Sequence, residues 1–390
     1  MLWYTSVLRK SFILFFLFCC LFNGQSQQDS LYARQVIKKL TSKEFFGRGY
    51  VHDGLDKAAK YIVKELKRFG AKQLFNTGYY QWFDFNVNTF PGKMEVKANG
   101  KLLKPGVDYI VNEESAPLKG VFNVERKDSV TFISGQGSMP LVVSLKRKLT
   151  FSVSTEVAPY CGIQLLNKDN YTNLETVMVN IESKLLTKYI NKNICAYFPG
   201  KVNNDSMIVL SAHYDHLGGM GGQVYFPGAN DNASGVSMLL NLVKYYSKNP
   251  PKYKTVFVFF AGEEAGLLGS KYFTDHATVD LGKIKFLLNL DLLGTGDEGI
   301  TVVNATEFKP QFERMKKINE EKHYLALVKP RGKAQNSDHY WFTEKGVPCF
   351  FIYTMGGIKA YHDVYDKEET LPLTKYHQVF TLLSEFIESI

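Results

Sequence analysis

The second half of the chain alternates between continuous apolar runs and segments with helical periodicity. Four apolar runs after Lys201 are typical of buried strands: Met207–Ala212, Thr255–Phe260, Lys285–Leu290 and Val347–Tyr353. Residues 233–246 and 376–387 place apolar side chains three and four positions apart, as on one face of an amphipathic helix. Strands that alternate with helices predict an α/β fold, with a doubly wound, largely parallel sheet and helices on both faces.

The first half of the chain has two different patterns. Helical spacing runs through residues 30–70, and the stretch Leu55–Phe69 is followed by Gly70, a residue that often ends a helix. We expect this helix to pack on the main core. Residues 90–185 instead contain short alternating runs around turn residues such as Asn99-Gly100, a typical hairpin turn. We therefore expect a smaller, mostly β insert over residues 90–185.

The first residues have the pattern of a secretory signal peptide. Arg9 and Lys10 precede an uninterrupted apolar run, Phe12–Phe22, which is too short to span a membrane. Small and polar residues follow this run, and we expect cleavage before Gln27. Residues 1–26 would then be removed, and the mature protein would be secreted or periplasmic.

The five cysteines do not form a disulfide or zinc-binding framework. Cys19 and Cys20 lie in the predicted signal peptide, and lipid attachment there is the less favoured alternative because a bulky residue precedes each of them. The remaining Cys161, Cys195 and Cys349 are odd in number and contain no Cys-x-x-Cys pair. We therefore expect neither a disulfide scaffold nor thiolate ligands for a metal ion.

Composition and charge narrow the classes of function. A chain of 390 residues that is 45% hydrophobic can bury one large core and a smaller module. The formal net charge is +9 at pH 7, but the basic residues are scattered and form no stripe with aromatic residues, as nucleic-acid binding would require. We expect no nucleic-acid partner and no stable membrane span. No sequence pattern indicates the oligomeric state.

Acidic residues and histidines follow the predicted strands at the points where the strands end. Because ligands of open α/β sheets gather at the carboxyl edge of the strands, these side chains are expected to converge. Six of them, from five separate segments, are placed in this way: His213, Asp231, Glu263, Glu264, Asp291 and His362. The sequence therefore predicts one polar site at this edge of the sheet.

Each of these residues also has a structural explanation when it is taken alone. A single histidine after a strand is usually a hydrogen-bonded structural residue, and Glu263-Glu264 would favour the beginning of a helix. Asp231-Asn232 could form an ordinary turn. The joint pattern is more informative, because imidazole and carboxylate groups without thiolates are suited to two metal cations. Zinc is the favoured metal.

Six strings in this region resemble, in order and rough spacing, the motifs of metallopeptidase family 28, the secreted dizinc aminopeptidases. They are SAHYDHLG, GANDNASG, FFAGEEAGLLGS, NLDLLG, NSDHYWF and AYHDVYD. The match covers residues 190–390, and the string GRGYVHDGLDKAAKYIVKELKRFG resembles the opening helix of the family. The resemblance implies a dizinc peptidase catalytic domain over residues 186–390, with residues 27–89 as its N-terminal part. The insert over 90–185 would be a reduced protease-associated domain or an unrelated module.

The resemblance also implies a role for each residue of the site. Asp231 would bridge two zinc ions, with His213 and Asp291 completing one site and Glu264 and His362 completing the other. Glu263 would be the general base. The implied activity is hydrolysis of the N-terminal peptide bond of peptides, through a water shared by the two zinc ions and activated by Glu263.

Several residues around these ligands have implied supporting roles. Asp215 would hold the metal-binding segment in place, and Tyr361 would either assist an oxyanion through its hydroxyl group or pack against the site. The bond between Asp231 and Asn232 is expected to be cis, as it often is in the family. Four further motif residues match without being ligands, and structural or supporting roles are expected for them: His216, Ser337, Asp338 and His339.

Dipeptidase or carboxypeptidase action remains open at this point, and so do two functions other than peptide hydrolysis. A glutaminyl cyclase shares the fold and much of the ligand pattern but uses a single zinc ion to cyclise an N-terminal glutamine. A catalytically inactive binding protein with this fold is the other alternative. The partners expected for a peptidase are peptide substrates with a free N-terminus, with side-chain preference set by the loops over residues 218–226, 295–299 and 355–360.

Overall fold

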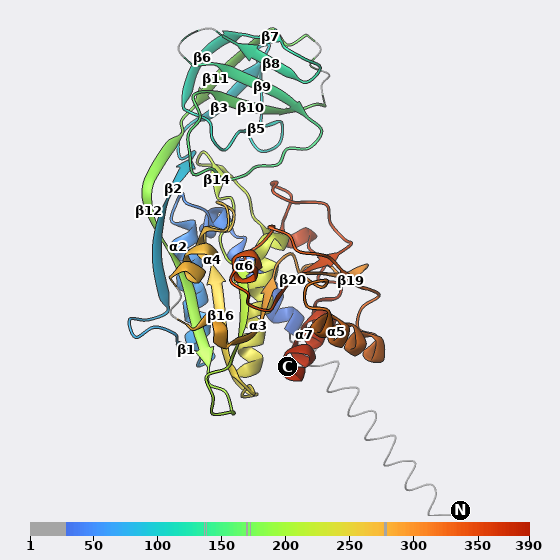
Figure 1. Ribbon diagram of the computed structural model, residues 1–390. Helices are drawn as coiled ribbons and strands as arrows, with labels where there is room; N and C mark the ends of the chain where they lie inside the picture. Colours follow the sequence, from blue (N-terminus) through green and yellow to red (C-terminus); the bar gives the residue numbers. More distant parts are fainter. Residues whose placement is uncertain (1–28, 136, 138, 169–170, 172, 277–278) are drawn as a thin grey trace, which may run out of the picture.

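The computed structural model describes residues 29–390 apart from residues 136, 138, 169–170, 172 and 277–278. The predicted signal peptide, residues 1–26, therefore lies outside the described residues. Figure 1 shows an α/β body and a β-rich part, joined by the long strands β2 (Tyr80–Thr89) and β12 (Lys184–Phe198). Within the described residues, no helix is long and apolar enough to cross a membrane.

The body is built on one mixed sheet of nine strands. Four central strands run parallel in the order β16 (Lys254–Phe260), β13 (Met207–His213), β17 (Ile284–Leu290) and β20 (Cys349–Met355). Antiparallel strands flank them, because β12 pairs with β16 on one side and β18 (Gly299–Val303) pairs with β20 on the other. The predicted α/β class is confirmed, with parallel pairing concentrated at the centre of the sheet. The remaining strands of this sheet are β1 (Lys72–Gln73), β19 (Val328–Pro330) and β2.

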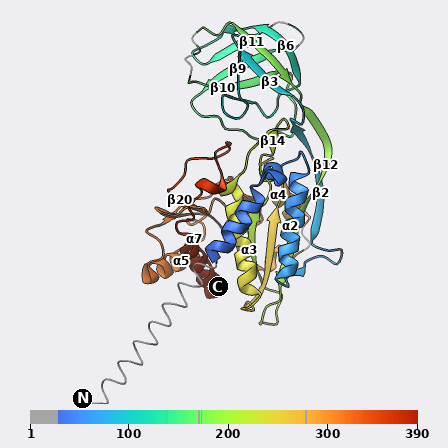
Figure 2. The ribbon, with the colours of Figure 1, turned by 180° about the vertical axis from the view of Figure 1, so that it is seen from behind.

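Helices cover both faces of this sheet, as predicted. On one face, the apolar residues of α2 (Gly54–Arg68), α3 (Gly235–Tyr246), α5 (Lys309–Lys322), α7 (Tyr376–Ser389) and a helix over residues 29–40 join one core with the sheet. In Figure 2, α2 and α3 lie side by side on this face. On the other face, α4 (Leu268–Asp275) and α6 (His339–Glu344) bury Phe273 and Phe342 against the sheet.

Residues 30–70 are not helical throughout, which corrects the sequence-based expectation. The helix over residues 29–40 ends before η1 (Lys43–Arg48), and α2 begins only at Gly54. Positive φ angles at Phe46 and Arg48 interrupt the helical path, although neither residue is a glycine. Apolar spacing alone did not reveal this break, because Phe45 and Phe46 are buried in the turn as they would be in a helix.

The β-rich part, residues 94–181, contains two sheets that enclose their own apolar core. The Asn99-Gly100 turn joins β3 to β4, and both of its residues have the positive φ angles that such a hairpin turn requires. One sheet contains β3 (Met94–Ala98), β4 (Lys101–Leu102), β6 (Leu118–Asn123) and β11 (Thr176–Ile181). The other contains β5 (Tyr109–Val111), β7 (Glu125–Arg126), β8 (Thr131–Ser134), β9 (Leu141–Lys146) and β10 (Cys161–Leu166).

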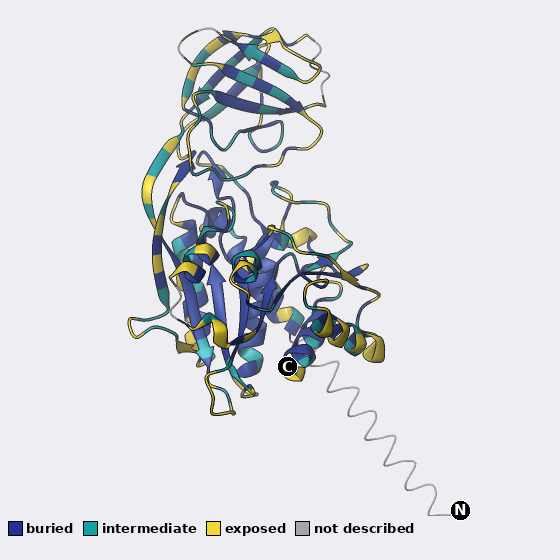
Figure 3. Cartoon of the chain, in the orientation of Figure 1, coloured by how far each residue is buried: buried dark blue, intermediate teal, exposed yellow. Residues whose placement is uncertain are grey.

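The strand β12 belongs to both parts of the molecule. Its first portion pairs with β2, from Lys184 opposite Thr89 to Ile194 opposite Tyr80, and its last residues pair with β16 of the central sheet. Figure 3 shows that the ribbon formed by β2 and β12 mixes exposed, intermediate and buried residues, whereas the central strands are buried. Short elements complete the chain: β14 (Gly219–Met220), β15 (Val224–Tyr225), η2 (Ala229–Ser234), η3 (Leu281–Lys283) and η4 (Glu368–Thr370).

Candidate metal centre

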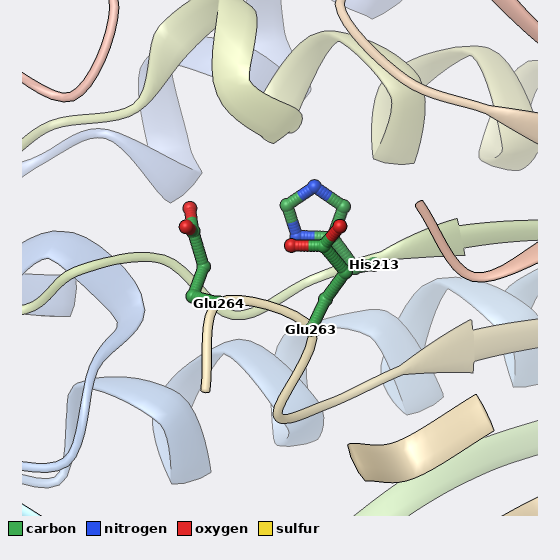
Figure 4. A group of neighbouring side chains, drawn as sticks. All are labelled: His213, Glu263 and Glu264. Atoms are coloured by element: carbon green, nitrogen blue, oxygen red, sulfur yellow. The ribbon is translucent and has the colours of Figure 1, made fainter. Parts of the chain in front are cut away.

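The candidate site lies at the carboxyl edge of the central parallel strands. His213 is the last residue of β13, Asp291 directly follows β17, and Glu263-Glu264 follows β16. Ligand atoms of His213, Glu263 and Glu264 lie within 4.8 Å of one another, and Figure 4 shows the three side chains projecting from neighbouring strand ends. The edge of the sheet thus gathers these side chains as the sequence pattern predicted.

A first cluster forms around the imidazole of His213. Its Nε2 atom lies 3.3 Å from Asp231 Oδ1 and 3.4 Å from Asp291 Oδ2. All three residues are buried. Burial is the main cause that raises the pKa of the Asp291 carboxyl, although His213 opposes this shift.

A second cluster forms around His362. Its Nε2 atom lies 3.1 Å from Asp231 Oδ2 and 3.1 Å from Glu264 Oε2. Asp231 therefore presents one carboxylate oxygen to each cluster. The structure brings together all five residues that the sequence analysis assigned as metal ligands.

Hydrogen bonds to Asp366 and the glycine at residue 228 define the backbone conformation around Asp231. The Asp231–Asn232 peptide bond in η2 is cis, as the family resemblance implied. The backbone N–H groups of Asn230 and Asp231 donate to the carboxylate of Asp366 at 2.8 and 3.0 Å. Gly228 precedes this turn with a φ of +61°, and a Cβ atom there would lie 2.1 Å from the Asp231 carbonyl oxygen. Only glycine therefore fits at residue 228.

Arg48 is fully buried beneath this turn, and each of its contacts is with a backbone carbonyl. Nε donates to Tyr214 at 3.1 Å, and the two terminal nitrogens donate to four more carbonyl oxygens. These acceptors belong to Leu40, Pro227, Gly228 and Asp231, at 2.8 to 3.2 Å. The guanidinium group thus connects η1 to the segment that carries the shared carboxylate.

Asp215 holds the Glu263-Glu264 turn rather than forming part of either cluster. Its carboxylate accepts from the backbone N–H groups of Glu263 and Glu264 at 3.3 and 3.4 Å, and from the Tyr50 hydroxyl at 3.2 Å. It also lies 3.7 Å from Nδ1 of His213. Asp215 thus contacts the turn that carries Glu263 and Glu264, and the supporting role implied for it stays a prediction.

His216 lies closer to the centre than the sequence analysis expected. Its Nδ1 is 2.6 Å from Glu264 Oε1 and 4.0 Å from Asp231 Oδ1, and the three residues form a possible metal-binding group. The His216 ring is fully buried, and Nε2 has no hydrogen-bond partner among the described residues. Sequence reasoning matched His216 to a motif but had no signal for this direct contact with Glu264.

Tyr361 and the 337–339 segment border the two clusters. The Tyr361 ring stacks on the His362 ring with 4.0 Å between centroids, and burial raises the pKa of its hydroxyl above the usual range. Ser337 donates to Asp291 Oδ2 at 3.3 Å. Asp338 and His339 are both buried. Burial raises the pKa of the Asp338 carboxyl to about 7 and lowers the pKa of the His339 imidazole to about 3.

The electrostatics of the site fit metal cations. Burial alone would lower the pKa of His362, but the Glu264 and Asp231 carboxylates outweigh it and raise that pKa to about 11. The pocket thus favours positive charge on the imidazole, and a cation between the same atoms would satisfy the carboxylates equally well. Asp291 Oδ1 is buried without a hydrogen-bond partner among the described residues. The atoms available to coordinate a metal ion are imidazole nitrogens and carboxylate oxygens, which are suited to zinc.

The three cysteines of the described residues take no part in this centre. Cys161 is buried in the core of the β-rich part, and Cys195 and Cys349, on strands of the central sheet, belong to the core between that sheet and the helices α4 and α6. Burial raises the pKa of each thiol, to about 11 for Cys349. The possible metal-binding groups among the described residues consist of histidine and carboxylate side chains.

Sequence comparison relates the chain to a family of peptidases. The model of peptidase family M28 matches residues 193–387. The aminopeptidase YwaD of Bacillus subtilis (strain 168) is 26% identical over 280 residues, which cover 70% of this chain and 56% of that protein. The chain therefore spans little more than half the length of this curated relative.

Solved structures share the fold over almost the whole chain. A zinc aminopeptidase from Bacillus subtilis superposes with a TM-score of 0.66 at 18% identity, covering 92% of this chain and 94% of that one. A glutaminyl cyclase from Bacteroides thetaiotaomicron superposes with a TM-score of 0.50 at 16% identity, covering 92% and 97% of the two chains. At these identities the likeness establishes the fold and leaves the reaction to the chemistry of the site.

Proposed function

The chain belongs to peptidase family M28, and on this premise we propose that it is a secreted metallo-aminopeptidase that hydrolyses the N-terminal bond of peptides. The observation that carries the proposal is the position of Asp231, whose two carboxylate oxygens face the two separate clusters around His213 and His362. A carboxylate shared in this way is suited to two cations rather than one. The apolar run Phe12–Phe22 supports secretion.

The five predicted ligands would hold two zinc ions. His213, Asp231 and Asp291 would bind the first, and His362, Asp231 and Glu264 would bind the second. When bound, such ions lower the pKa of a coordinated water to about 7 and polarise the substrate carbonyl group.

Glu263 would act as the general base and then as the general acid. Its carboxyl group lies beside His213, and burial raises its pKa well above the usual range, with Glu264 adding to the shift and His213 opposing it. A raised pKa makes the ionised carboxylate a stronger base, so Glu263 in its ionised form would take a proton from the attacking water and then deliver it to the departing amine. This transfer contributes roughly 10² to 10⁴ in rate.

Asp215 would keep this base in place. Because Asp215 accepts hydrogen bonds from the backbone N–H groups of Glu263 and Glu264, it would fix the direction in which both side chains leave the backbone. The Tyr361 hydroxyl would donate to the substrate oxygen as negative charge develops there. This hydroxyl would remain protonated near neutral pH, since partial burial and the nearby carboxylates of Asp231 and Glu264 raise its pKa above the usual range.

The test is a panel of peptides incubated with the zinc-loaded protein. An aminopeptidase will release residues from free and C-terminally amidated peptides and will leave N-acetylated peptides intact. Formation of pyroglutamate from peptides with an N-terminal glutamine, with one zinc ion per chain, would establish a cyclase instead. Tight zinc binding with no product from any peptide would identify an inactive binding protein.

A further inference from the structure

A short segment of the β-rich part reaches across to the candidate metal centre. We call residues 148–153, between β9 and β10, the strap. The backbone N–H of Phe151 donates to the carbonyl oxygen of His362 at 2.9 Å. Nδ1 of the His362 ring lies 3.1 Å from the carbonyl oxygen of Phe151 in return. The strap and His362 are therefore joined by two reciprocal hydrogen bonds.

The second of these bonds fixes the form of the imidazole. A carbonyl oxygen can only accept, so Nδ1 of His362 carries the hydrogen. In the neutral ring that a metal ion requires, Nε2 is then the atom that offers a lone pair, and it is 3.1 Å from both Asp231 Oδ2 and Glu264 Oε2. The backbone of the strap thus holds the ring in the tautomer and the direction that a metal at the second cluster requires.

Lys148, at the start of the strap, holds the loop that carries His362. Its Nζ donates to the carbonyl oxygens of Lys359 and Tyr361 at 3.0 and 3.1 Å, and it lies 3.2 Å from Asp363 Oδ2. Asp363 in turn accepts the N–H groups of Tyr361 and Tyr365. One ammonium group therefore ties together the residues on both sides of His362.

The strap is itself anchored by aromatic packing. The Phe151 ring stacks on Phe226, with centroids 4.7 Å apart and planes only 6° from parallel, and it meets the edge of Phe90 at 6.1 Å. Phe151, Phe226 and Phe90 are all buried. The carbonyl group that faces His362 is thus attached to a fixed side chain rather than to a free loop.

From these contacts we propose that the β-rich part positions His362 for the second zinc ion through the strap, with Lys148 as a positioning residue. The proposal rests on the proposed dizinc function. It gives the β-rich part a role in assembling the centre. The residues of the first cluster come from the ends of β13 and β17 and from η2, all in the body, so the strap should affect the second zinc ion and leave the first unchanged.

The experiment compares zinc binding by the full-length wild-type protein and by Lys148→Met, using competition with a chromophoric chelator and elemental analysis after dialysis. We expect two zinc ions in the wild type and about tenfold weaker binding of the second ion in the variant, the lower end of the effect typical for groups that orient a metal ligand. Lys146→Met, which removes an exposed cation at the end of β9, is the matched control and should bind like the wild type. Lys148→Arg should restore most of the affinity.

Kinetics give a second measurement on the same proteins. At limiting zinc, Lys148→Met should have a lower kcat than the wild type. At saturating zinc, its kcat should return to the wild-type value because excess metal fills the second site, and KM should change little. Phe151→Ala should weaken the second ion further, provided that its circular dichroism spectrum remains that of the wild type.

The outcomes separate the two proposals. Equal affinity for both ions in the wild type and Lys148→Met would overturn the role of the strap and leave the dizinc function standing. A wild-type protein that holds only one zinc ion would overturn both.

Discussion

Glu263 and Glu264 are neighbours in the chain, yet their surroundings shift their pKa values in opposite directions. Burial raises the pKa of Glu263 well above the usual range. Burial would also raise that of Glu264, but the nearby His362 and His216 rings lower it to about 2. Two carboxyl groups whose pKa values are separated by their surroundings are suited to different tasks. Glu264 is suited to remain an anion beside a cation, and Glu263 to exchange a proton.

Replacing Glu263 by Gln tests this division at the residue scale. The amide keeps the shape of the side chain but cannot accept a proton, so we expect turnover to fall by roughly 10² to 10⁴ while both zinc ions remain bound. Steady-state kinetics and elemental analysis of one preparation measure the two effects. Glu264→Gln is the matched control and should lose the second zinc ion. Near-normal turnover by Glu263→Gln would remove Glu263 from the mechanism.

Sequence reasoning identified the site residues that directly follow predicted strands. It missed the residues whose side chains contact backbone groups of other segments. His213 and Asp291 could be placed because each comes directly after an apolar run. Asp366 and Arg48 could not be placed, because their contacts are with backbone groups distant in the chain. The contact between His216 and Glu264 depends on how two loops face each other, and no spacing within one segment encodes it.

At the scale of elements, Arg48 is the connection between η1 and η2. Its contacts join the N-terminal turn to the carbonyl groups of Pro227, Gly228 and Asp231, which lie more than 170 residues away in the chain. Burial lowers the pKa of the guanidinium group to about 10, while Asp231 opposes the shift, so Arg48 remains charged near neutral pH. A buried cation that satisfies several carbonyl groups is costly to remove.

We therefore expect Arg48→Met to destabilise the protein strongly, by about 4 kcal/mol or more, because several buried carbonyl oxygens would lose their donors. Arg48→Lys keeps the charge but offers fewer donors in the fork geometry, and about 2 to 3 kcal/mol is expected. Denaturant unfolding of the metal-free proteins measures both changes. A Met variant as stable as the wild type would contradict this account of the turn.

The predicted elements were most accurate where both faces of a strand are buried. The runs at Met207–Ala212 and Thr255–Phe260 correspond to β13 and β16, with boundaries that differ by one residue. They could be recognised because every position of these strands except Lys254 is buried. The ribbon of β2 and β12 gave no such signal. The first portion of β12 is largely exposed, so neither a continuous run nor a clear alternation marks it in the sequence.

For the molecule as a whole, zinc and protons compete for the same imidazole nitrogens. In the metal-free protein the pKa of His362 is raised from 6.5 to about 11 by Glu264 and Asp231 against the effect of burial. The resulting stabilisation is fully present below about pH 6.5 and is lost as the pH rises towards about 11. Zinc requires the deprotonated ring, so stabilisation by zinc instead increases with pH.

We expect the Tm of the chelator-treated protein to fall between about pH 6.5 and pH 9. The zinc-loaded protein should gain about 4 kcal/mol at a zinc concentration a thousandfold above Kd, so the gap in Tm should widen across this range. Thermal melts with and without chelator at matched ionic strength measure the gap. A gap that narrows as the pH rises would show that His362 is not where protons and metal compete.

The fold class could be predicted from the alternation of elements, whereas the placement of the β-rich part over the centre could not. That placement depends on the ribbon, and on contacts such as those of Phe151 with Phe226 and His362, which join distant segments. Local pattern contains no information on such pairs. The periodicity predicted that residues 90–185 form strands but gave no indication of which loop would meet His362.

The pairing of Thr89 with Lys184 means that the polypeptide leaves the ribbon and re-enters it at adjacent points. A different module could therefore be joined between these two residues while the pairing of β2 with β12 is kept, so the ribbon is a suitable place for grafting experiments. To keep the second cluster in place, a transplanted module would have to reproduce the contacts of the strap with the loop that carries His362. It would have to bring a backbone oxygen to the same place beside the ring of His362.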